Sequence, residues 1–281
     1  MKHRLRILFA AVALLLSLVP SPAVAGSAKV RQGDKQVAAR QYTKALKSFR
    51  DAIRKDPKDA EAMTRIGDLH ASGQGVPRSD NEAVRWYAKA ASLGDAAARF
   101  ALAARYASGH GVGKDPAAAA KWCRLAADQG HPGAQSLLGF LYEQGMGVPR
   151  DEAESLAWYR KAAEGGDVAA QKSLAWRHLE GVGVPKDLAA AAAWYRKAAE
   201  AGDPDAQVRL AGMYRDGIGV PMEPVEAATW YRKAAEKGNA EAFAGYGRAL
   251  LYGRGVAQNE SAAADWIRKA AERGVPEGIF L

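Results

Sequence analysis

The sequence predicts an all-α protein, an α-solenoid in which antiparallel helical hairpins stack into a right-handed superhelix. Two observations predict this. Each interval of 36 residues holds two helical segments with matching cap residues and glycine stops. Tryptophan also recurs at that spacing without insertion or deletion, at Trp86, Trp122, Trp158, Trp194, Trp230 and Trp266. A repeat of this length cannot bury its apolar face alone, so neighbouring repeats must stack to form the core.

The first 25 residues have the pattern of a secretory signal peptide. Lys2, Arg4 and Arg6 form a basic start, residues 7–19 are almost wholly apolar, and small residues lead up to Ala25. The apolar stretch is shorter than the roughly 20 residues that span a bilayer. We expect cleavage near Ala25 and a periplasmic or secreted mature protein, with an uncleaved anchor as the alternative. No later segment is apolar enough to cross a membrane.

The predicted mature chain is mildly basic. Three basic residues and no acidic ones lie in residues 1–25, so cleavage lowers the formal net charge from +9 to +6. Such a charge suits anionic glycans, lipids or acidic proteins. The single cysteine, Cys123, excludes an internal disulfide. It stands where other repeats have tyrosine, so we interpret it as a packing residue, with a redox or intermolecular role as the alternative.

The segment 26–59 is expected to form a related N-terminal hairpin. Gly33, Tyr42, Ala45 and Phe49 follow part of the 34-residue tetratricopeptide pattern, although the first-helix Trp and Leu of that pattern are absent. At the other end, residues 275–281 begin another unit, and we expect them to form a short capping tail or to leave an apolar edge for self-association.

Residues 167–202 show how one repeat is built. Asp167 and Asp187 are expected to cap the two helices, because a side-chain oxygen can accept from a free backbone N–H. Gly181 and Gly202 end the helices, because glycine tolerates a positive φ. The equivalent first-helix caps are Asp59, Asp95, His131, Asp167, Asp203 and Asn239, and the second-helix caps are Ser79, Asp115, Asp151, Asp187, Glu223 and Asn259. The six repeats therefore span 60–274.

Two further columns indicate close packing. One first-helix position always holds a small residue, which lets the two helices of a hairpin approach: Gly67, Ala103, Gly139, Ala175, Ala211 and Gly247. The periodic tryptophans are expected to fill the space between neighbouring repeats, as core residues.

The repeated pattern resembles the Sel1-like repeat family, a branch of the tetratricopeptide-like α-solenoids. The residues that carry the resemblance recur as Ala134, Leu138, Gly139, Tyr142, Gly145, Gly147, Val148, Ala157, Trp158, Tyr159, Lys161, Ala162, Ala163, Gly165 and Gly166. The resemblance implies an adaptor or scaffold role, and exported bacterial members are similar to regulators of sensor kinases, envelope scaffolds and host-interaction factors. A cysteine-rich branch is associated with β-lactam binding or hydrolysis, but its paired cysteines are missing here.

No enzyme signature stands out from the repeats. The histidines show no metal-ligand spacing, and the glycine-rich stretch 109–114 lacks the upstream Gly and following Ser or Thr of a phosphate loop. We therefore expect no enzyme activity, metal or cofactor. Arg160, Arg196, Arg232 and Arg268 each precede a glutamate by four residues, which predicts weak surface ion pairs, with a polyanion-binding ridge as the alternative.

The resemblance also implies that first helices line an inner, concave wall. The second, fifth, ninth and twelfth first-helix positions would face it, and these vary between repeats while their neighbours do not. Apolar and basic residues there predict a groove with an aromatic centre and a basic flank, formed by Phe100, Phe140, Lys172, Trp176, Leu179, Arg215 and Arg248. The alternative is that Phe140 and Trp176 pack as core.

These features favour an exported, non-enzymatic scaffold for protein–protein interaction in the cell envelope, a regulator or an assembly adaptor. The second hypothesis is a scaffold for anionic polysaccharide or cell-wall glycan. A β-lactam or peptidoglycan hydrolase ranks third. No nucleic-acid partner is expected.

Overall fold

The computed structural model describes residues 27–275, and every helix or strand assigned within them is an α-helix. The predicted signal peptide, residues 1–25, and all but the first residue of the predicted tail lie outside the described residues. The described chain divides into two compact units, one ending at Gly165 and the other beginning at Gly166. Each unit is described by itself.

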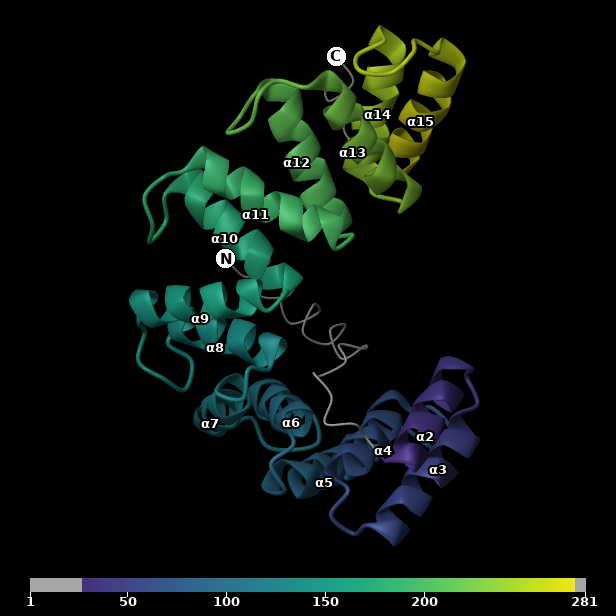
Figure 1. Cartoon of the computed structure of the whole chain (residues 1–281), viewed down its shortest axis with the longest axis vertical. Helices are drawn as coiled ribbons and strands as arrows, with labels where there is room; N and C mark the ends of the chain where they lie inside the picture. Colours follow the sequence, from purple (N-terminus) through teal and green to yellow (C-terminus); the bar gives the residue numbers. More distant parts are fainter. Residues whose placement is uncertain (1–26, 276–281) are drawn as a thin grey trace. The chain divides into compact units, whose positions relative to one another are not determined.

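Unit 1 consists of four helical hairpins (Figure 1). Its helices are α2 (Ala28–Ala38), α3 (Tyr42–Lys55), α4 (Ala60–Ser72), α5 (Asp80–Ser92), α6 (Ala96–Ser108), α7 (Pro116–Ala127), α8 (Pro132–Gln144) and α9 (Glu152–Glu164). Within a hairpin the two helices pack along each other, and the second helix of each hairpin also contacts the first helix of the next. The predicted stack of hairpins is therefore confirmed within this unit.

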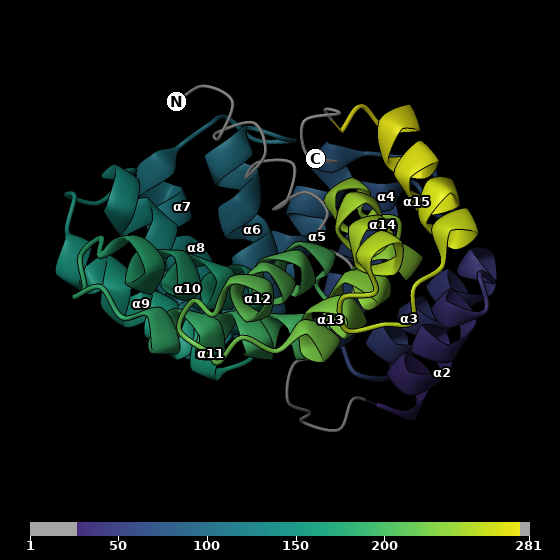
Figure 2. The same cartoon turned by 90° about the horizontal axis from the view of Figure 1, so that it is seen from above.

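Unit 2 consists of three further hairpins. Its helices are α10 (Val168–Glu180), α11 (Leu188–Glu200), α12 (Pro204–Asp216), α13 (Pro224–Glu236), α14 (Ala240–Tyr252) and α15 (Glu260–Glu272). The first helices α12 and α14 also touch each other directly (Figure 2).

The cap residues explain where the helices begin. Asp59, Asp95 and the equivalent residues of the later repeats each accept the backbone N–H three residues on, as predicted. Among the second helices of the six repeats, only α13 begins without this bond, because the side chain of Glu223 does not cap it. Each satisfied cap contributes about 1 kcal/mol to helix stability.

The two positive-φ glycines of the loop after α8 are required for different reasons. Gly145 ends α8 in the left-handed conformation, with φ of 66°. Gly147, with φ of 73°, lies against the preceding hairpin, where an added Cβ would come within 1.9 Å of the carbonyl oxygen of Pro116. The first glycine is therefore needed to end a helix, and the second to let two repeats approach.

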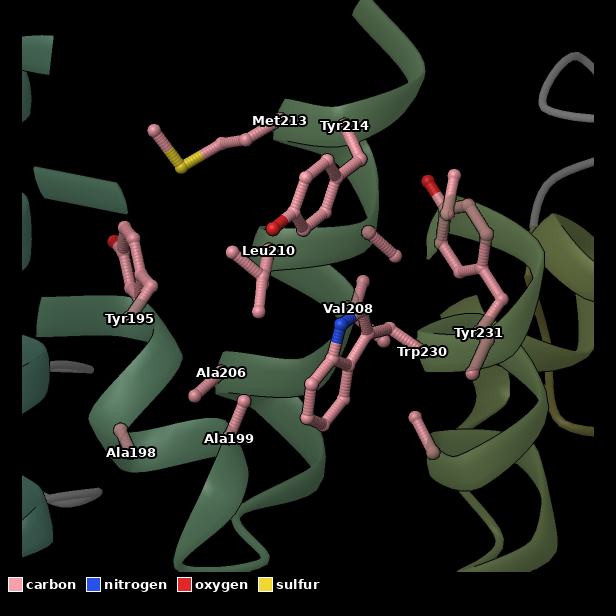
Figure 3. Close-up of a cluster of buried hydrophobic side chains, with 14 of the residues drawn as sticks. Tyr195, Ala198, Ala199, Ala206, Val208, Leu210, Met213, Tyr214, Trp230 and Tyr231 are labelled. Carbon is pink, nitrogen blue, oxygen red and sulfur yellow. The ribbon is translucent and has the colours of Figure 1, made fainter. Parts of the chain in front are cut away.

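The core follows the small-residue column. At Gly67 an added Cβ would lie 2.6 Å from the ring of Tyr87, so the small residue lets α4 and α5 approach as predicted. In unit 2, alanines of α11 share a core cluster with larger side chains of α12 and α13, among them Leu210 and Trp230 (Figure 3).

The prediction that all six periodic tryptophans are core residues is only partly right. Trp158 and Trp230 are buried, whereas the other four are half-buried at the edges of the core clusters. Trp86 packs against two successive clusters of unit 1, and Trp122 does the same one repeat later. The tryptophans thus join neighbouring repeats, with one ring face near the surface.

Candidate functional site

The fifth position of the first helix contacts the next repeat. Thr64 donates to the carboxylate of Asp95 at 2.9 Å, and Lys172 reaches the carboxylate of Asp203 at 2.8 Å. Both partners are the helix cap 31 residues further on. His131, the cap of α8, likewise stands 31 residues after Phe100, and the centroids of their two rings lie 4.8 Å apart. This position therefore links repeats.

Two predicted groove residues are already engaged in contacts within the protein. Phe100 is only 9% exposed and belongs to the core cluster of α6 to α9, so it offers no surface to a partner. Lys172 is half-buried, and its ammonium lies 2.8 Å from Asp203 and 3.7 Å from Asp205. Its charge is already balanced within the protein.

The twelfth position contacts the hairpin's own second helix. Arg215 donates twice to the carboxylate of Asp216, at 2.7 and 2.6 Å, and once to the hydroxyl of Tyr231 at 3.3 Å. These bonds lower the pKa of Asp216 and raise that of Arg215. Leu179, at the same position in α10, is half-buried against the core of unit 2.

The ninth position holds the exposed tryptophan of the predicted groove. In unit 2 it holds Trp176, Gly212 and Arg248, on the successive first helices α10, α12 and α14. The side chain of Trp176 is 38% exposed, although it is one of the largest apolar groups in the chain. Phe140, at this position in unit 1, is instead half-buried against the core cluster of α6 to α9. The two aromatic residues, which the sequence assigns to one groove, thus differ in burial.

Gly212 leaves open space beside its α-carbon, here called the gap. An added Cβ would meet only the hydroxyl of Tyr231, at 3.7 Å. Trp176 holds the equivalent position on the preceding first helix, α10. Arg248 holds it on the following first helix, α14, and its charge, with that of Arg215, contributes to lowering the pKa of Asp216. We call Trp176, Gly212 and Arg248 the ninth-position surface.

Two groups of charges lie around this surface. Around the hydroxyl of Tyr231, the guanidinium groups of Arg215 and Arg248 are accompanied by the carboxylates of Asp216 and Glu241. Near Trp176, the ammonium of Lys172 is held by two carboxylates. The predicted basic flank is therefore confined to the neighbourhood of Arg215 and Arg248.

Sequence reasoning placed Gly212 on the concave wall without selecting it as a site residue, and it missed Tyr231. A signal for the links between repeats was present, because residues 31 apart form chemically matched pairs in two repeats, Thr64 with Asp95 and Lys172 with Asp203. The gap had a weaker signal, since a glycine in the middle of a helix needs a reason.

The basic ridge on the second helices is also different from the prediction. Of the expected Arg–Glu pairs, Arg232 and Glu236 approach to 4.0 Å, whereas Arg268 pairs with Asp265 and Arg196 bonds the hydroxyl of Tyr214. The neighbouring lysines lie over the periodic indoles, 4.0 to 4.7 Å from the ring centroids, in the pairs Lys89–Trp86, Lys161–Trp158, Lys197–Trp194, Lys233–Trp230 and Lys269–Trp266. Much of the ridge is thus engaged in cation–π contacts.

Other candidate groups are structural. The thiol of Cys123 is buried and donates to the carbonyl oxygen of Ala134 at 3.0 Å, which agrees with a packing role, and burial raises its pKa. Within residues 27–275, no group of three or more His, Cys, Asp or Glu side chains is placed to hold a metal ion. In the same stretch no helix has the length and apolar character needed to cross a membrane.

Stacked helical hairpins whose first helices vary at fixed positions define a repeat scaffold, and the comparisons identify its family. The Sel1 repeat model matches six times without a gap, at 60–95, 96–131, 132–167, 168–203, 204–239 and 240–275. The chain therefore belongs to the Sel1 repeat family, as the sequence predicted. These proteins are helical scaffolds, typically for protein–protein interaction and generally without enzyme activity. No curated protein matches the chain.

Two solved structures are similar in sequence as well as fold. One is c5321, a protective antigen of uropathogenic Escherichia coli strains, with 36% identity and a TM-score of 0.77 over 90% of this chain. The chain spans only 55% of the length of that protein. The other is a Sel1 repeat protein from Oxalobacter formigenes, with 33% identity and a TM-score of 0.68, covering 86% of this chain and 96% of the other.

A more distant likeness concerns the fold alone. The immunity protein Pa5087 from Pseudomonas aeruginosa has 20% identity and a TM-score of 0.51, covering 81% of this chain and 83% of its own.

Proposed function

We propose that this chain is an exported scaffold of the cell envelope that holds a segment of a partner protein on the ninth-position surface of unit 2. The observation that carries the proposal is the exposed indole of Trp176, on a first helix whose successor has open space at the equivalent Gly212. Exposed tryptophan and arginine are the side chains that most often dominate protein interfaces. A regulator or an assembly adaptor would both work through such a surface.

The surface has a chemistry that selects its partner. An apolar side chain of the partner fits the gap at Gly212, against the indole of Trp176. A neighbouring carboxylate fits Arg248, since Arg215 already takes most of the charge of Asp216. The hydroxyl of Tyr231 at the floor of the gap offers one hydrogen bond. We therefore propose a partner segment with an apolar residue close to an acidic one.

The structure gives less support to an anionic glycan. Of the three basic residues expected to flank the groove, Lys172 and Arg215 are bonded to carboxylates of the protein. Stacking on a sugar needs a free aromatic face. In the periodic tryptophans that have a neighbouring lysine, the lysine ammonium lies over the indole ring and occupies one face. A protein segment needs only the single indole of Trp176, so it is the function that we propose.

The test places a photo-crosslinking amino acid at position 176 in the full chain in its native cell. The control position is 232 on α13, because Arg232 is well exposed and makes only a weak pair with Glu236 at 4.0 Å. A discrete protein adduct from position 176, absent at 232, is expected. Equal labelling from both positions, or none from 176 in folded protein, would refute the proposed surface.

Two substitutions then test the proposed partner chemistry. Trp176→Ala and Arg248→Glu should each weaken binding of the crosslinked partner at least tenfold, because interface hot spots are worth about 2 kcal/mol or more. Arg232→Glu is the charge-matched control for the second. If Arg248→Glu binds as well as the parent chain, the acidic residue of the partner is wrong even though the surface stands.

A further inference from the structure

Three exposed apolar side chains lie where the chain passes from α12 into α13 (Figure 1). Ile218 is 37% exposed, Met222 65% and Val225 64%. Among residues 27–275, Met222 and Val225 are the two most exposed large apolar side chains. We call Ile218, Met222 and Val225 the loop surface.

The backbone brings these residues to one end of the hairpin. Both ends of the loop are held on the last turn of α12, because the amides of Ile218 and Glu223 donate to its carbonyl oxygens at 2.9 and 3.0 Å. An added Cβ on Gly217 would lie 3.6 Å from the Cβ of Met222, so the two strands of the loop run side by side. Val225 follows in the first turn of α13.

The fold of the loop does not require apolar residues at these positions. Every repeat builds the same loop, with two glycines at positive φ. The equivalents of Met222 are polar in the other five repeats, namely Arg78, Lys114, Arg150, Lys186 and Gln258. The equivalents of Val225 are small or polar, namely Asn81, Ala117, Ala153, Ala189 and Ser261. An apolar surface that the fold does not need is typical of an interaction site.

The start of α13 also lacks a contact that the equivalent helices have. Asp187, for example, caps α11 by accepting the amide of Ala190 at 2.9 Å. Glu223 holds the cap position of α13 but makes no such bond. Within residues 27–275, the carboxylates of Glu223 and Glu226 have no hydrogen bond or ion pair, so both remain available to a partner.

The charge of this segment differs from that of its equivalents. Residues 217–226 contain the two carboxylates of Glu223 and Glu226 and no lysine or arginine. Each equivalent segment of the other five repeats contains a basic residue, namely Arg78, Lys114, Arg150, Lys186 and Arg254. The loop surface is therefore the one among the six that joins apolar side chains to negative charge alone.

The surroundings do not cancel this charge. Arg215 and Asp216, just before the loop, form an ion pair with each other at 2.6 Å. The loop packs on the start of α11, where Lys186 and Asp187 carry opposite charges. Both neighbouring pairs are thus neutral, and the carboxylates of the loop surface keep their negative charge.

We propose that the loop surface binds a segment of a partner protein in which apolar and basic residues alternate. Apolar side chains of the segment cover Met222 and Val225, and methionine suits such contacts because its side chain adapts to the shape of a partner. Lysine or arginine of the segment pairs with Glu223 and Glu226, which selects against acidic segments and anionic membranes. This surface lies apart in sequence from Trp176, and it does not rest on the proposed function.

Met222 supplies the probe for the test. The full chain is labelled with ¹³C at the methionine methyl groups, and its spectrum is followed by NMR while a short peptide of alternating leucine and lysine is added. The Met222 methyl resonance should shift, whereas those of Met63 and Met213 should not, because these two side chains are buried. A matched peptide of alternating leucine and glutamate should need at least tenfold higher concentration for the same Met222 shift.

A double variant tests the residues. Met222→Lys with Val225→Ala gives the loop the residues of the preceding repeat, Lys186 and Ala189. It should weaken binding of the lysine peptide at least tenfold by fluorescence anisotropy and leave the thermal midpoint unchanged, because both side chains are exposed. Trp176→Ala should leave this affinity unchanged, which keeps the test apart from that of the proposed function.

Four results would overturn the proposal. Equal Met222 shifts with the two peptides would show that charge does not select the partner, and full affinity of the double variant would place the contact elsewhere. A Met222 shift that grows with protein concentration alone would make a second copy the occupant. A shift caused by phosphatidylcholine vesicles and not by the lysine peptide would make lipid the occupant.

Discussion

Protonation of His131 is expected to weaken unit 1 between pH 7.5 and 5.5. His131 begins α8, where its Nδ1 accepts the amide of Ala134 at 3.2 Å. Only a neutral imidazole has a lone pair at that atom. Burial beside the ring of Phe100 lowers the pKa of His131, and the carboxylate of Asp95 opposes this only in part.

The sign of the pH effect follows from that shift. The unfolded chain has a histidine pKa near 6.5, and the folded chain has a lower one. Between the two values the unfolded state binds more protons, so stability falls as the pH falls. The contribution of His131 is therefore complete above pH 6.5 and is lost as the pH drops through the folded pKa.

The size of the effect is set by the cap. Loss of one side-chain cap costs about 1 kcal/mol. His131→Asn keeps an acceptor that does not titrate, as Asn239 does at the start of α14. His131→Ala loses the cap at every pH. In the asparagine variant the cap of α8 should therefore not depend on pH in this window, and the alanine variant should be about 1 kcal/mol less stable than it throughout.

The assay is the urea midpoint of each chain, followed by helical circular dichroism, at pH 7.5 and 5.5. A change of about 1 kcal/mol moves the midpoint by roughly 0.3–1 M at the usual slopes. The comparison with His131→Asn is essential, because burial raises the pKa of Asp68 to about 6, which gives unit 1 an opposite trend in this range. Equal pH dependence in the parent chain and His131→Asn would refute the reasoning.

Three further predictions concern packing, charge and export. Gly147→Ala should destabilise the chain by several kcal/mol in thermal melts, because φ is +73° and the added Cβ would come within 1.9 Å of the Pro116 carbonyl oxygen. The control Gly113→Ala should be nearly neutral, because the space around Gly113 is open. Asp80→Ala should cost about 3 kcal/mol in the same assay, since it leaves the buried guanidinium of Arg105 without its 2.6 Å partner. N-terminal sequencing of the exported protein should show that it begins at residue 26. An N-terminus at residue 1 would contradict the signal-peptide prediction.

Most of the fold could be predicted from the sequence because its causes are local. A cap such as Asp187 and a stop such as Gly202 act within one turn of their own helix, so the residue type is enough to place them. Because the period is strict, each local signal recurs in all six repeats. The packing of Gly67 on Tyr87 could be predicted because every repeat has a small residue at the position of Gly67.

The candidate site could not be predicted equally well, because exposure depends on neighbours distant in sequence. Phe100 and Trp176 are both aromatic residues of a first helix. Phe100 is buried beside the ring of His131 in the next repeat, whereas the side chain of Trp176 is 38% exposed. Likewise, Lys172 reads as a free charge until Asp203 is placed beside it. Periodicity identifies equivalent positions, but the identity of each neighbour decides what remains available.

Gly212 offers a last prediction that separates stability from binding. Glycine within a helix costs about 0.5–1 kcal/mol relative to alanine. At Gly245 that cost has a structural reason, because a Cβ would collide with the ring of Tyr231 at 2.5 Å. At Gly212 the nearest atom is the Tyr231 hydroxyl at 3.7 Å, an ordinary contact, so packing gives no reason for a glycine there.

Gly212→Ala should therefore stabilise the chain by about 0.5–1 kcal/mol. Gly212→Trp should fill the gap at Gly212 and abolish the crosslink from position 176, while the chain stays folded. If Gly212→Ala is instead destabilising, the glycine has a packing role after all and the gap is not a binding feature. If Gly212→Trp leaves the crosslink intact, the partner does not enter between Trp176 and Arg248, and its contact with the indole must come from another side.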